Sequence, residues 1–403
     1  MRLMNTQKSW LIWQRPSWPD LRFDLQAAAP DLIHAHRMLG EIEGKAAAIG
    51  LGSQNDVALE VFSGEVIATA AIEGERLSAD AVRSSVMRRL GMDTGTIGPA
   101  DRHVDGLVEV INDATTAFDQ PLDEDRLCRW QSALFPGGTS GIQRIAVGRY
   151  RDHQEAMQIV SGTPGKEVVH YEAPPSKAVR AEMDRFLAWF AGTAPTAEGV
   201  TAVEGQIDGL ARAAMAHLWF ESIHPFEDGN GRIGRAIMDM AIAQHQRKPL
   251  RLYSLSRQLL NSRKDYYDTL NEAQRGDVDV THWVRWLAQQ FAAACRYSST
   301  VIDQAIAKRR FWEQHAGTVN ERQRKVLQRL LDDGDGGFSG GLNAEKYIKI
   351  TGASKPTATR DLAAMVSAGQ LWTVGTGKAV RYYINMPGWT HGVERVPIDS
   401  NPG

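Results

Sequence analysis

Apolar residues recur at helical spacing through most of the first 90 positions. These positions mark one face of a predicted helix and the start of the next helix: Leu32, His36, Leu39, Ile42, Val57 and Val61. A Gly-rich stretch at 91–101 then interrupts the pattern, as is typical of a boundary. We therefore expect residues 1–95 to form an N-terminal helical domain.

The pattern changes from helical to strand-like at one place in the middle of the chain. The segment 141–175 is rich in β-branched residues and Gly, which predicts a hairpin. Pro174 and Pro175 end this extended segment, because Pro disfavours helix in the residue before it and suits the first turn of a helix. We expect residues 96–295 to form a second, mainly helical domain with this small hairpin, followed by a helical linker over 296–319.

The C-terminal part has a pattern of its own. Residues 320–385 read as three helices followed by two alternating strands, which is the order of a winged helix-turn-helix. Ser354 is placed to cap the third helix and Gly369 to end it. Residues 386–403 are polar and read as a loose tail. The predicted fold class is thus mainly α, with a small hairpin and a winged helix.

Composition narrows the class of protein. Of the 403 residues, 43% are hydrophobic and 23% charged, as in ordinary globular proteins, and the net charge is −2. Cys128 and Cys295 are far apart and lack metal-ligand spacing, which favours a reducing cytosol. No segment reaches the ~20 apolar residues that a membrane span needs. We expect a soluble, cytoplasmic protein without a membrane partner.

The predicted winged helix carries a mild positive charge. Residues 321–385 hold ten Lys or Arg against six Asp or Glu. Lys355, Thr357, Thr359 and Arg360 fall on or near the predicted recognition helix, where a DNA reader would place phosphate and base contacts. Winged helices also mediate protein contacts, so DNA binding and a protein-contact role both stay open.

The segment FESIHPFEDGNGRIGR, from Phe220 to Arg235, concentrates groups that suit phosphate chemistry. Gly229 and Gly231 allow a sharp turn and leave backbone N–H groups free at a helix N-terminus, which favours an anion. Arg232 and Arg235 lie in the first turn, where the helix dipole favours acids instead. Two arginines at this end therefore indicate a multiply charged phosphate nearby.

Two more groups in the same loop add chemistry. Asp228 would repel a phosphate unless Mg²⁺ lay between them. His224 has a side chain that ordinarily titrates near neutral pH, as proton transfer requires. Each feature alone is more often structural, since a His before Pro and a Gly-Asn-Gly turn are common. Their conjunction within sixteen residues favours a functional site.

The stretch HPFEDGNGRIGR matches the HPFx(D/E)GNGRxxR signature of Fic proteins, also called the Fido family. The resemblance implies a helical core that transfers AMP from ATP to a Ser, Thr or Tyr hydroxyl of a protein, with release of pyrophosphate. It implies that His224 is the general base and that Asp228 holds Mg²⁺. The residues that would hold the phosphates are Gly229, Asn230, Gly231, Arg232 and Arg235.

Two further segments are similar to parts of this family. VVHYEAPPSKAV resembles the flap, whose edge binds a segment of the target protein by strand addition. SRKDYYDTLNEAQRGD (262–277) resembles the helix that lines the adenine and ribose, although two tyrosines on a helix are more often core. The implied residues are Val169, His170, Tyr171 and Glu172 in the flap, and Tyr266, Tyr267 and Gln274 at the nucleoside.

An inhibitory element is implied in the N-terminal block, which also resembles an uncharacterised helical domain fused to Fic cores. Thr69 and Glu73 lie four apart on one helix face, and Gly74 would end that helix. The pattern resembles the (S/T)xxxE(G/N) helix of the family, here at about 57–74. The resemblance implies that Glu73 pairs with Arg235 and so occupies the cation that the γ-phosphate needs.

Other functions stay open at this stage. A nucleotide-sensing, DNA-binding transcriptional regulator would use the same phosphate loop, and a de-AMPylase would remove AMP from the same target. Relatives that transfer UMP, phosphocholine or phosphate usually have an altered loop, whereas Gly229, Asn230 and Gly231 are intact here. The resemblance also implies a homodimer and leaves self-modification open.

Overall fold

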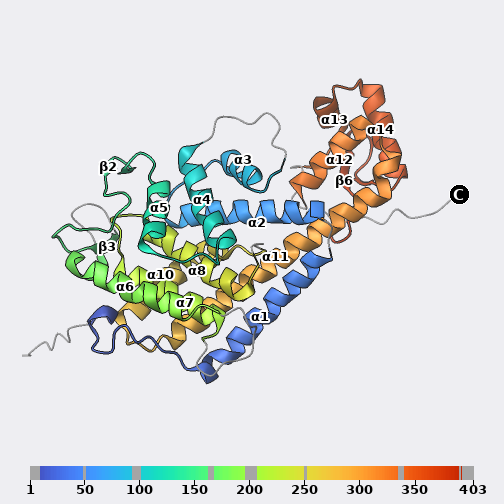
Figure 1. Ribbon diagram of the computed structural model, residues 1–403. Coiled ribbons are helices and arrows are strands. Elements are labelled where there is room, and N and C mark those ends of the chain that lie inside the picture. Colours follow the sequence, from blue (N-terminus) through green and yellow to red (C-terminus); the bar gives the residue numbers. More distant parts are fainter. Residues whose placement is uncertain are drawn as a thin grey trace, which may run out of the picture. The chain divides into compact units, whose positions relative to one another are not determined.

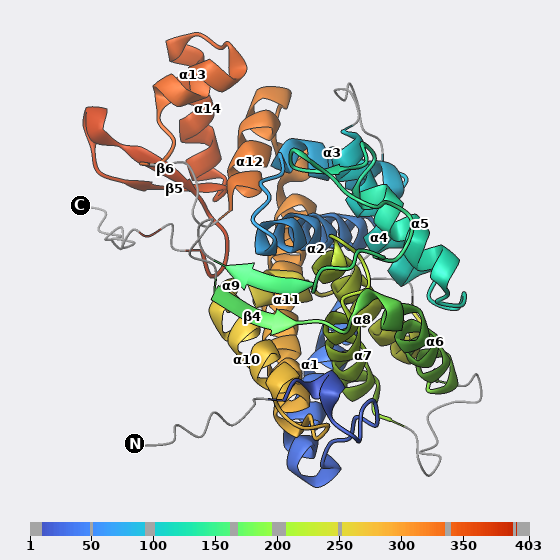
Figure 2. The same cartoon turned by 90° about the vertical axis from the view of Figure 1, so that its left-hand side faces the viewer.

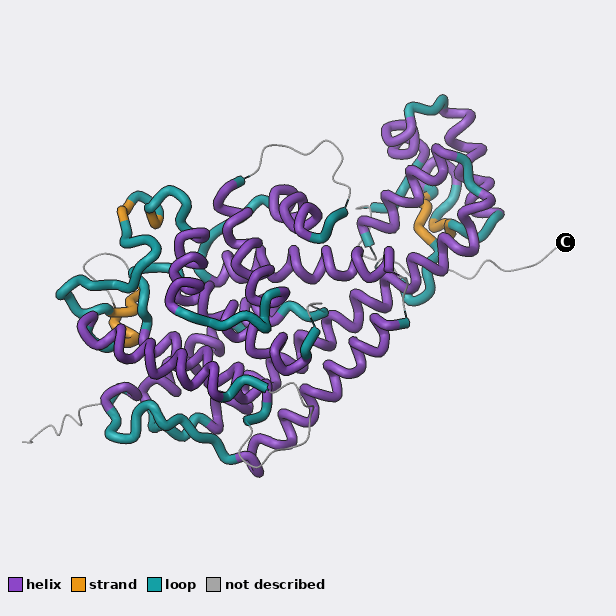
Figure 3. The backbone as a smooth tube through the Cα atoms, viewed as in Figure 1, coloured by secondary structure: helices purple, strands orange, loops and turns teal. Residues whose placement is uncertain are grey.

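The computed structural model describes residues 10–48, 51–92, 101–161, 168–195, 207–248, 252–334, 340–389 and 392. They are mainly helical, and Figure 3 shows that the strands are short. The chain divides into two compact units, Met1–Ile302 and Asp303–Gly403. The first unit contains both blocks that the sequence predicts before residue 296, and the division between those blocks stays a prediction.

The N-terminal helices follow the predicted apolar spacing. Asp24 starts α1 by accepting hydrogen bonds from the backbone N–H groups of the first turn, and Leu32, Leu39 and Ile42 are buried on its inner face. Gly74, with φ +84°, follows the end of α2 as predicted. The elements are η1 (Ile12–Gln14), α1 (Leu25–Ala47), α2 (Leu51–Ile72) and α3 (Ala79–Arg89).

The core of the first unit is built around α7, whose residues are all buried. It packs along α8, and α8 in turn contacts α4 and α5 (Figure 1). The elements are α4 (Arg102–Thr116), α5 (Glu124–Leu134), α6 (Ser176–Gly192), α7 (Gly209–Ile223), α8 (Asn230–Gln246), α9 (Leu255–Asn261), α10 (Arg263–Arg275) and the first part of α11 (Thr281–His315), a helix that continues into the second unit. Since the HPFEDGNGRIGR segment joins α7 to α8, it lies at the centre of this core.

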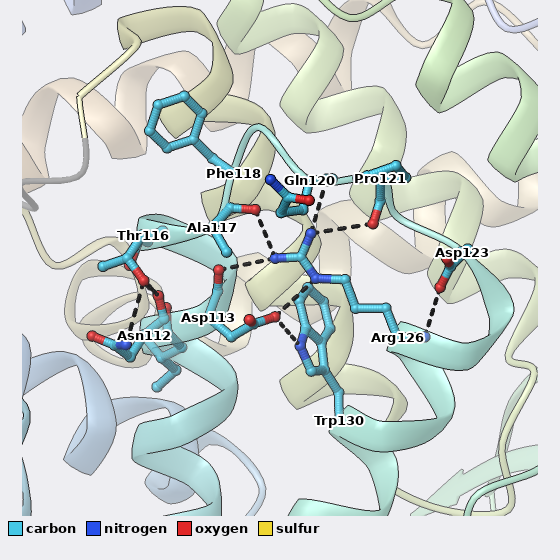
Figure 4. Close-up of polar contacts among 12 residues, drawn as sticks. Asn112, Asp113, Thr116, Ala117, Phe118, Gln120, Pro121, Asp123, Arg126 and Trp130 are labelled. Carbon is cyan, nitrogen blue, oxygen red and sulfur yellow. Dashed lines mark hydrogen bonds and ion pairs between the residues drawn. The ribbon is translucent and has the colours of Figure 1, made fainter.

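A buried arginine ties α4 to α5 (Figure 4). The Arg126 Nε donates to Asp113 Oδ2 at 2.8 Å, and the Trp130 Nε1 donates to the same oxygen at 2.7 Å. The Arg126 guanidinium also donates to four backbone oxygens, those of Asp113, Ala117, Gln120 and Pro121. A buried cation paired in this way fixes α5 against α4, and the other end of α5 reaches the loop, since Leu134 and Phe135 lie against Gly229.

The predicted hairpin is present but shorter than the sequence suggests. Strand β3 (Gln158–Ser161) pairs antiparallel with β4 (Val168–Glu172), and the register shifts between Ile159 and Val160. Figure 2 shows β4 beside α10, which it contacts. The hairpin predicted within 141–175 is confirmed as β3 and β4, and the stretch 141–151 adds little strand to it. Only β1 (Thr139–Ser140) and β2 (Gln143–Arg144) pair there, because Gly148 turns the chain at φ +72° and Arg151 is buried beneath the loop.

The second unit has the element order that the sequence predicts, and its assignment as a winged helix stays a prediction. Its apolar core includes Leu327, Leu362 and Leu371. Ser354 precedes α14, but its hydroxyl bonds Thr357 Oγ1 at 3.0 Å and makes no capping bond to the backbone, so the expected Ser354 cap is wrong. The elements are η2 (Ala316–Thr318), α12 (Glu321–Asp333), α13 (Ala344–Thr351), α14 (Lys355–Ser367), β5 (Leu371–Val374), η3 (Gly377–Ala379) and β6 (Arg381–Ile384).

Helices that could cross a membrane are absent from the described part of the chain, because none combines sufficient length with sufficient apolar character.

Candidate active site

The loop from α7 to α8 is shaped by two residues with positive φ. His224 ends α7 at φ 52°, an uncommon conformation for a residue with a side chain, and Gly229 precedes α8 at φ 88°. The Asn230 side chain closes the loop, since its Oδ1 accepts from Phe226 N at 2.9 Å and its Nδ2 donates to Phe226 O at 2.8 Å. The Asn230 amide therefore holds the turn that opens α8.

Arg151 supports this loop from outside the motif. Its Nε donates to His224 O at 2.7 Å, and its Nη2 donates to Pro174 O at 2.6 Å and Ile223 O at 3.2 Å. Its Nη1 donates to Ser176 Oγ at 2.9 Å. Burial lowers the pKa of Arg151 to about 10, so the side chain remains a cation at neutral pH. Sequence reasoning missed this residue, because nothing local marks an arginine that binds 73 positions away.

Arg235 is buried and bonded to Thr69 near the end of α2 and to Glu73 just after it. Its Nε donates to Thr69 Oγ1 at 2.7 Å, and its Nη2 donates to Thr69 O at 3.0 Å and to Glu73 Oε1 at 2.8 Å. Burial alone would lower the pKa of Arg235, but the Glu73 carboxylate outweighs it and the pKa is raised. The structure thus brings together the Thr69, Glu73 and Arg235 side chains that the sequence paired.

Glu73 also lies against the turn that opens α8. A methyl group built on Gly231 would collide with Glu73 Oε1 and would lie 3.1 Å from Arg235 Nη1. Gly229 is equally restricted, since a methyl group there would lie 2.9 Å from Phe135 Cε2. The carboxylate of Glu73 therefore occupies the anion-binding end of α8.

Arg232 is held by a second carboxylate, which sequence reasoning missed. Its Nη1 donates to Glu75 Oε1 at 2.8 Å, and its guanidinium lies 4.9 Å from the centre of the Phe135 ring. The Glu75 Oε2 lies 3.0 Å from His103 Nε2, while His103 Nδ1 lies 3.1 Å from Leu134 O. Both phosphate-side arginines are consequently paired with acids from the segment that follows α2.

The pKa shifts of Glu75 and His103 agree with each other, because each side chain stabilises the charged form of the other. The hydrogen bond that His103 donates to the Glu75 carboxylate raises the pKa of His103. Burial alone would raise the pKa of Glu75, but its bond with His103 and the Arg232 cation outweigh that effect and lower it. The nearest sequence signal was the acidic residue two positions after Glu73, and its partner His103 could not be identified without the fold.

Asp228 lies at the exposed side of the loop. Its Oδ2 accepts from Ser140 Oγ, its Oδ1 accepts from Gly229 N at 2.5 Å, and Arg232 Nη2 lies 3.5 Å from Oδ1. Within the described ranges, no group of three or more His, Cys, Asp or Glu residues could hold a metal ion. A single carboxylate fits Mg²⁺ when phosphate oxygens and water supply the other ligands. Asp228 can therefore serve Mg²⁺ that arrives with a nucleotide.

The residues expected at the nucleoside differ in accessibility. Tyr266 is 1% exposed, bonds His217 Nε2 at 2.7 Å through its hydroxyl, and stacks on Trp286. Tyr267 is 39% exposed, and its hydroxyl donates to Ile72 O at 3.3 Å. Gln274 is buried. Tyr267 is thus the expected nucleoside contact with a free surface, whereas Tyr266 belongs to the aromatic core.

The flap strand has an anchored side and an open side. The hydroxyl of Tyr171 is buried and donates to Ser222 O at 2.9 Å, which fixes β4 to α7. Val169 is 42% exposed, and the His170 carbonyl accepts from Arg275 Nε at 3.0 Å. The Glu172 carbonyl accepts from Trp13 Nε1 at 2.8 Å. Val169 is therefore the exposed flap residue, His170 and Glu172 are half-buried, and Tyr171 is an anchor.

His224 faces a buried acid that sequence reasoning also missed. Its Nδ1 lies 3.7 Å from Glu221 Oε2. Burial, aided by the Arg151 cation, lowers the pKa of His224 to about 4, so the ring is neutral at pH 7. Burial and then the Glu73 carboxylate raise the pKa of Glu221 to about 8, against the opposing effect of Arg235. The site thus holds a neutral imidazole, two buried cations and an anion-binding helix end.

Comparison with known families confirms the resemblance. The model of the Fic/DOC family matches residues 121–242, and that of a domain of unknown function, DUF4172, matches residues 11–92. The chain therefore carries a Fic/DOC family domain, centred on the loop described above.

Curated relatives match over part of their length only. The protein adenylyltransferase fic-1 of Caenorhabditis elegans is 33% identical over 88 residues, which cover 22% of this chain and 16% of that protein. A probable protein adenylyltransferase of Aquifex aeolicus is 32% identical over 77 residues, 19% of this chain and 22% of the relative. The uridine 5'-monophosphate transferase of Xanthomonas campestris is 29% identical over 129 residues, 32% of this chain and 22% of the relative. The chain thus spans less than a quarter of the length of these relatives.

Solved structures share the fold. A Fic family protein from Desulfovibrio desulfuricans has a TM-score of 0.50 at 20% identity, over 88% of this chain and 96% of that one. A Fic domain containing signaling protein from Bacteroides thetaiotaomicron has a TM-score of 0.50 at 14% identity, over 67% and 97%. The mainly helical Fic fold predicted from the motif is confirmed.

Proposed function

We propose that this chain with a Fic/DOC family domain is an autoinhibited protein adenylyltransferase, which transfers AMP from ATP to a Ser, Thr or Tyr hydroxyl of a protein. The observation that carries the proposal is the pairing of Arg235 with Glu73 at the N-terminus of α8. Arg235 is buried at the N-terminus of α8, where the helix dipole disfavours a cation, and an acid from another segment neutralises its charge. This arrangement supports a site at which a bound anion competes with that acid. The relatives that are named adenylyltransferases support ATP as that anion.

In the proposed reaction the substrate hydroxyl attacks the α-phosphorus of ATP. A new P–O bond forms, the bond from the α-phosphorus to the bridging oxygen breaks, and pyrophosphate leaves with the electron pair. The proton of the hydroxyl goes to His224 Nε2, because the ring is neutral and its Nδ1 faces Glu221. Asp228 would hold Mg²⁺ together with phosphate oxygens, and the bound ion would neutralise part of their charge.

In this proposal Glu73 inhibits the enzyme in two ways: it neutralises Arg235, and it occupies space that the phosphates need. The carboxylate of Glu73 occupies Arg235 and lies against Gly231, where the terminal phosphates of ATP would bind. With Glu73 in place, an entering triphosphate would find Arg235 already paired, and the Glu73 carboxylate would repel it. ATP would then bind in a pose in which the α-phosphorus is not aligned for attack.

Glu75 extends the inhibitory contact in the same proposal. It occupies Arg232 just as Glu73 occupies Arg235, and His103 holds it in place. Release of the inhibitory segment would therefore free two cations together. Activation would be cooperative, because both acids belong to one short segment after α2.

The decisive experiment is intact-mass spectrometry of the Glu73→Gly variant with ATP and Mg²⁺, alone and with cell lysate. AMP added to the chain or to a lysate protein supports the proposal if the Glu73→Gly/His224→Ala variant adds none. Glu60→Gly is the control, because it removes an exposed acid from α2, the helix that leads into Glu73. Wild-type activity equal to that of Glu73→Gly would refute autoinhibition. Absence of any adduct while ATP binds would favour a nucleotide sensor.

UMP transfer is a second candidate, favoured by the similarity to the Xanthomonas campestris transferase. The same experiment with UTP in place of ATP distinguishes the two. An adduct with UTP alone would reassign the nucleotide and leave the site chemistry unchanged. Loss of AMP from a previously modified protein would instead support de-AMPylation. An adduct on the chain alone supports self-modification, whereas the homodimer and DNA binding by the winged helix stay predictions.

A further inference from the structure

One edge of the flap strand β4 is held by a side chain from the start of the chain. The backbone N–H of Ala173 donates to Met157 O at 2.9 Å, so Ala173 faces the β3 side of the hairpin. Successive residues of a strand direct their backbone groups to opposite edges, so the Glu172 carbonyl points away from β3. That carbonyl accepts from Trp13 Nε1 at 2.8 Å. The outer edge of β4, which β3 leaves free, is therefore held by an indole from 159 positions earlier.

The end of α10 holds the same strand and is itself held by the N-terminal segment. Arg275, the last residue of α10, donates from Nε to His170 O at 3.0 Å. The next carbonyl along the chain, that of Gly276, accepts from Arg15 Nε at 2.9 Å. Trp13 belongs to η1, and Arg15 directly follows it. The N-terminal turn, β4 and the end of α10 thus form a closed set, in which each part is bonded to the other two.

The N-terminal turn has anchors of its own, so it can hold other parts in place. Ile12 is fully buried. A few residues on, Trp18 Nε1 donates to Glu182 Oε2 of α6 at 2.9 Å, and the Trp18 ring lies edge-on to that of Trp219 on α7, with 5.7 Å between the ring centres. Helix α7 is buried along its whole length. The turn that bonds the flap is therefore fixed to the core of the first unit.

We propose that Trp13 is a positioning residue for the flap, and that the segment matched by the domain of unknown function thereby sets where β4 lies relative to α10. This inference rests on the proposed function, in which the flap binds the target protein and α10 contacts the nucleoside through Tyr267. Because Trp13 and Arg275 occupy the outer edge of β4, a target segment has the edge of β3 left for strand addition, where Val160 is 47% exposed. A hairpin that is already held in place loses less conformational entropy when the target binds, so its affinity for the target is higher.

Hydrogen exchange of the nucleotide-free, full-length protein tests this without relying on catalysis. Trp13→Phe keeps an aromatic ring and removes only the indole N–H, so amide exchange in peptides covering 168–173 should become about fivefold faster, as for loss of one neutral hydrogen bond. Exchange in α7 should stay as in the wild type. Trp10→Phe is the matched control, because it makes the same replacement at a tryptophan that is 50% exposed. Unchanged exchange in 168–173, or a rise of equal size in α7, would overturn the inference.

Kinetics provide the second test, in the Glu73→Gly background and with the protein that this variant modifies as substrate. Trp13→Phe should raise KM for that protein about fivefold, while kcat and KM for ATP stay within about twofold, because the Trp13 bond is to β4 and not to the phosphate loop. Trp10→Phe should change none of the three. An unchanged KM for the protein, or an equal rise in KM for ATP, would overturn the inference. The expected exchange result without AMP transfer by any variant would support the inference and refute the proposed function.

Discussion

Replacing Glu221 with Gln should make the folded protein less sensitive to high pH, so the stability of the variant relative to the wild type should rise with pH. The acid is 6% exposed, and its environment raises its pKa to about 8 from an ordinary value of 4.5. A group whose pKa is higher in the folded state holds its proton there and resists ionising. Its contribution to stability is complete below pH 4.5 and is lost as the pH rises towards 8. Glutamine has no such loss.

The magnitude follows from the two pKa values. At about 1.36 kcal/mol for each unit between them, the change from 4.5 to about 8 corresponds to about 5 kcal/mol at pH 9. At pH 7, where part of that range has been crossed, the expected loss is about 3 kcal/mol. The pH-independent cost of burying the glutamine amide is the same at every pH. The quantity to compare is therefore the difference in unfolding free energy between pH 5 and pH 9.

Urea unfolding at pH 5, 7 and 9, followed by circular dichroism, measures this directly. The wild type should lose several kcal/mol between pH 5 and pH 9 relative to Glu221→Gln. Glu109→Gln is the control, because this exposed acid pairs with Arg89 at the surface and should leave the pH dependence unchanged. Parallel pH dependences of the wild type and Glu221→Gln would refute the buried-acid reasoning, whatever their absolute stabilities.

Three further changes follow from the same geometry. His224→Ala should abolish AMP transfer by Glu73→Gly while its ATP affinity, measured by calorimetry, stays within about threefold; normal modification of targets would contradict the general-base role. Glu75→Ala should tighten ATP binding about tenfold by freeing Arg232, equivalent to about 1.4 kcal/mol, and Glu109→Ala should not. Gly234→Ala should cost about 1–3 kcal/mol in unfolding free energy, because a methyl group there would meet Glu221 and His217; a melting temperature equal to that of the wild type would contradict the close approach of α7 and α8.

The local part of the site could be predicted from the sequence. A Gly-Asn-Gly turn before a helix specifies its own backbone, and the spacing of Thr69 and Glu73 specifies one helix face, so both are local properties. The ion pair between Glu73 and Arg235 needed a family resemblance, because 162 positions separate them. The hairpin is shorter than the predicted range, because β-branched residues at 141–151 indicate extended backbone without indicating a partner strand.

The residues that sequence reasoning missed share a physical property. Each is recognised by its burial or by its contacts outside the motif, and the type of residue reveals neither. These residues are Arg151, Glu75, His103 and Glu221. A charged residue in a sequence is more often at the surface, so a buried one is recognised only when the fold is known. Local chemistry was therefore predictable, and the residues that support it were not.

Helix α7 buries two charged side chains, Arg212 and Glu221, and they differ in how completely they are paired. Arg212 is fully buried, yet it donates to Thr193 Oγ1 at 2.9 Å, to Gln244 Oε1 at 2.9 Å and to Phe190 O at 2.6 Å. Pairing of this kind compensates the cost of removing a charge from water. Glu221, on the same helix, leaves one oxygen without a partner among the described residues. The burial cost of Glu221 is therefore not compensated by pairing, which is why its pKa is raised to about 8 and why its ionisation should destabilise the fold, whereas the paired Arg212 keeps its charge.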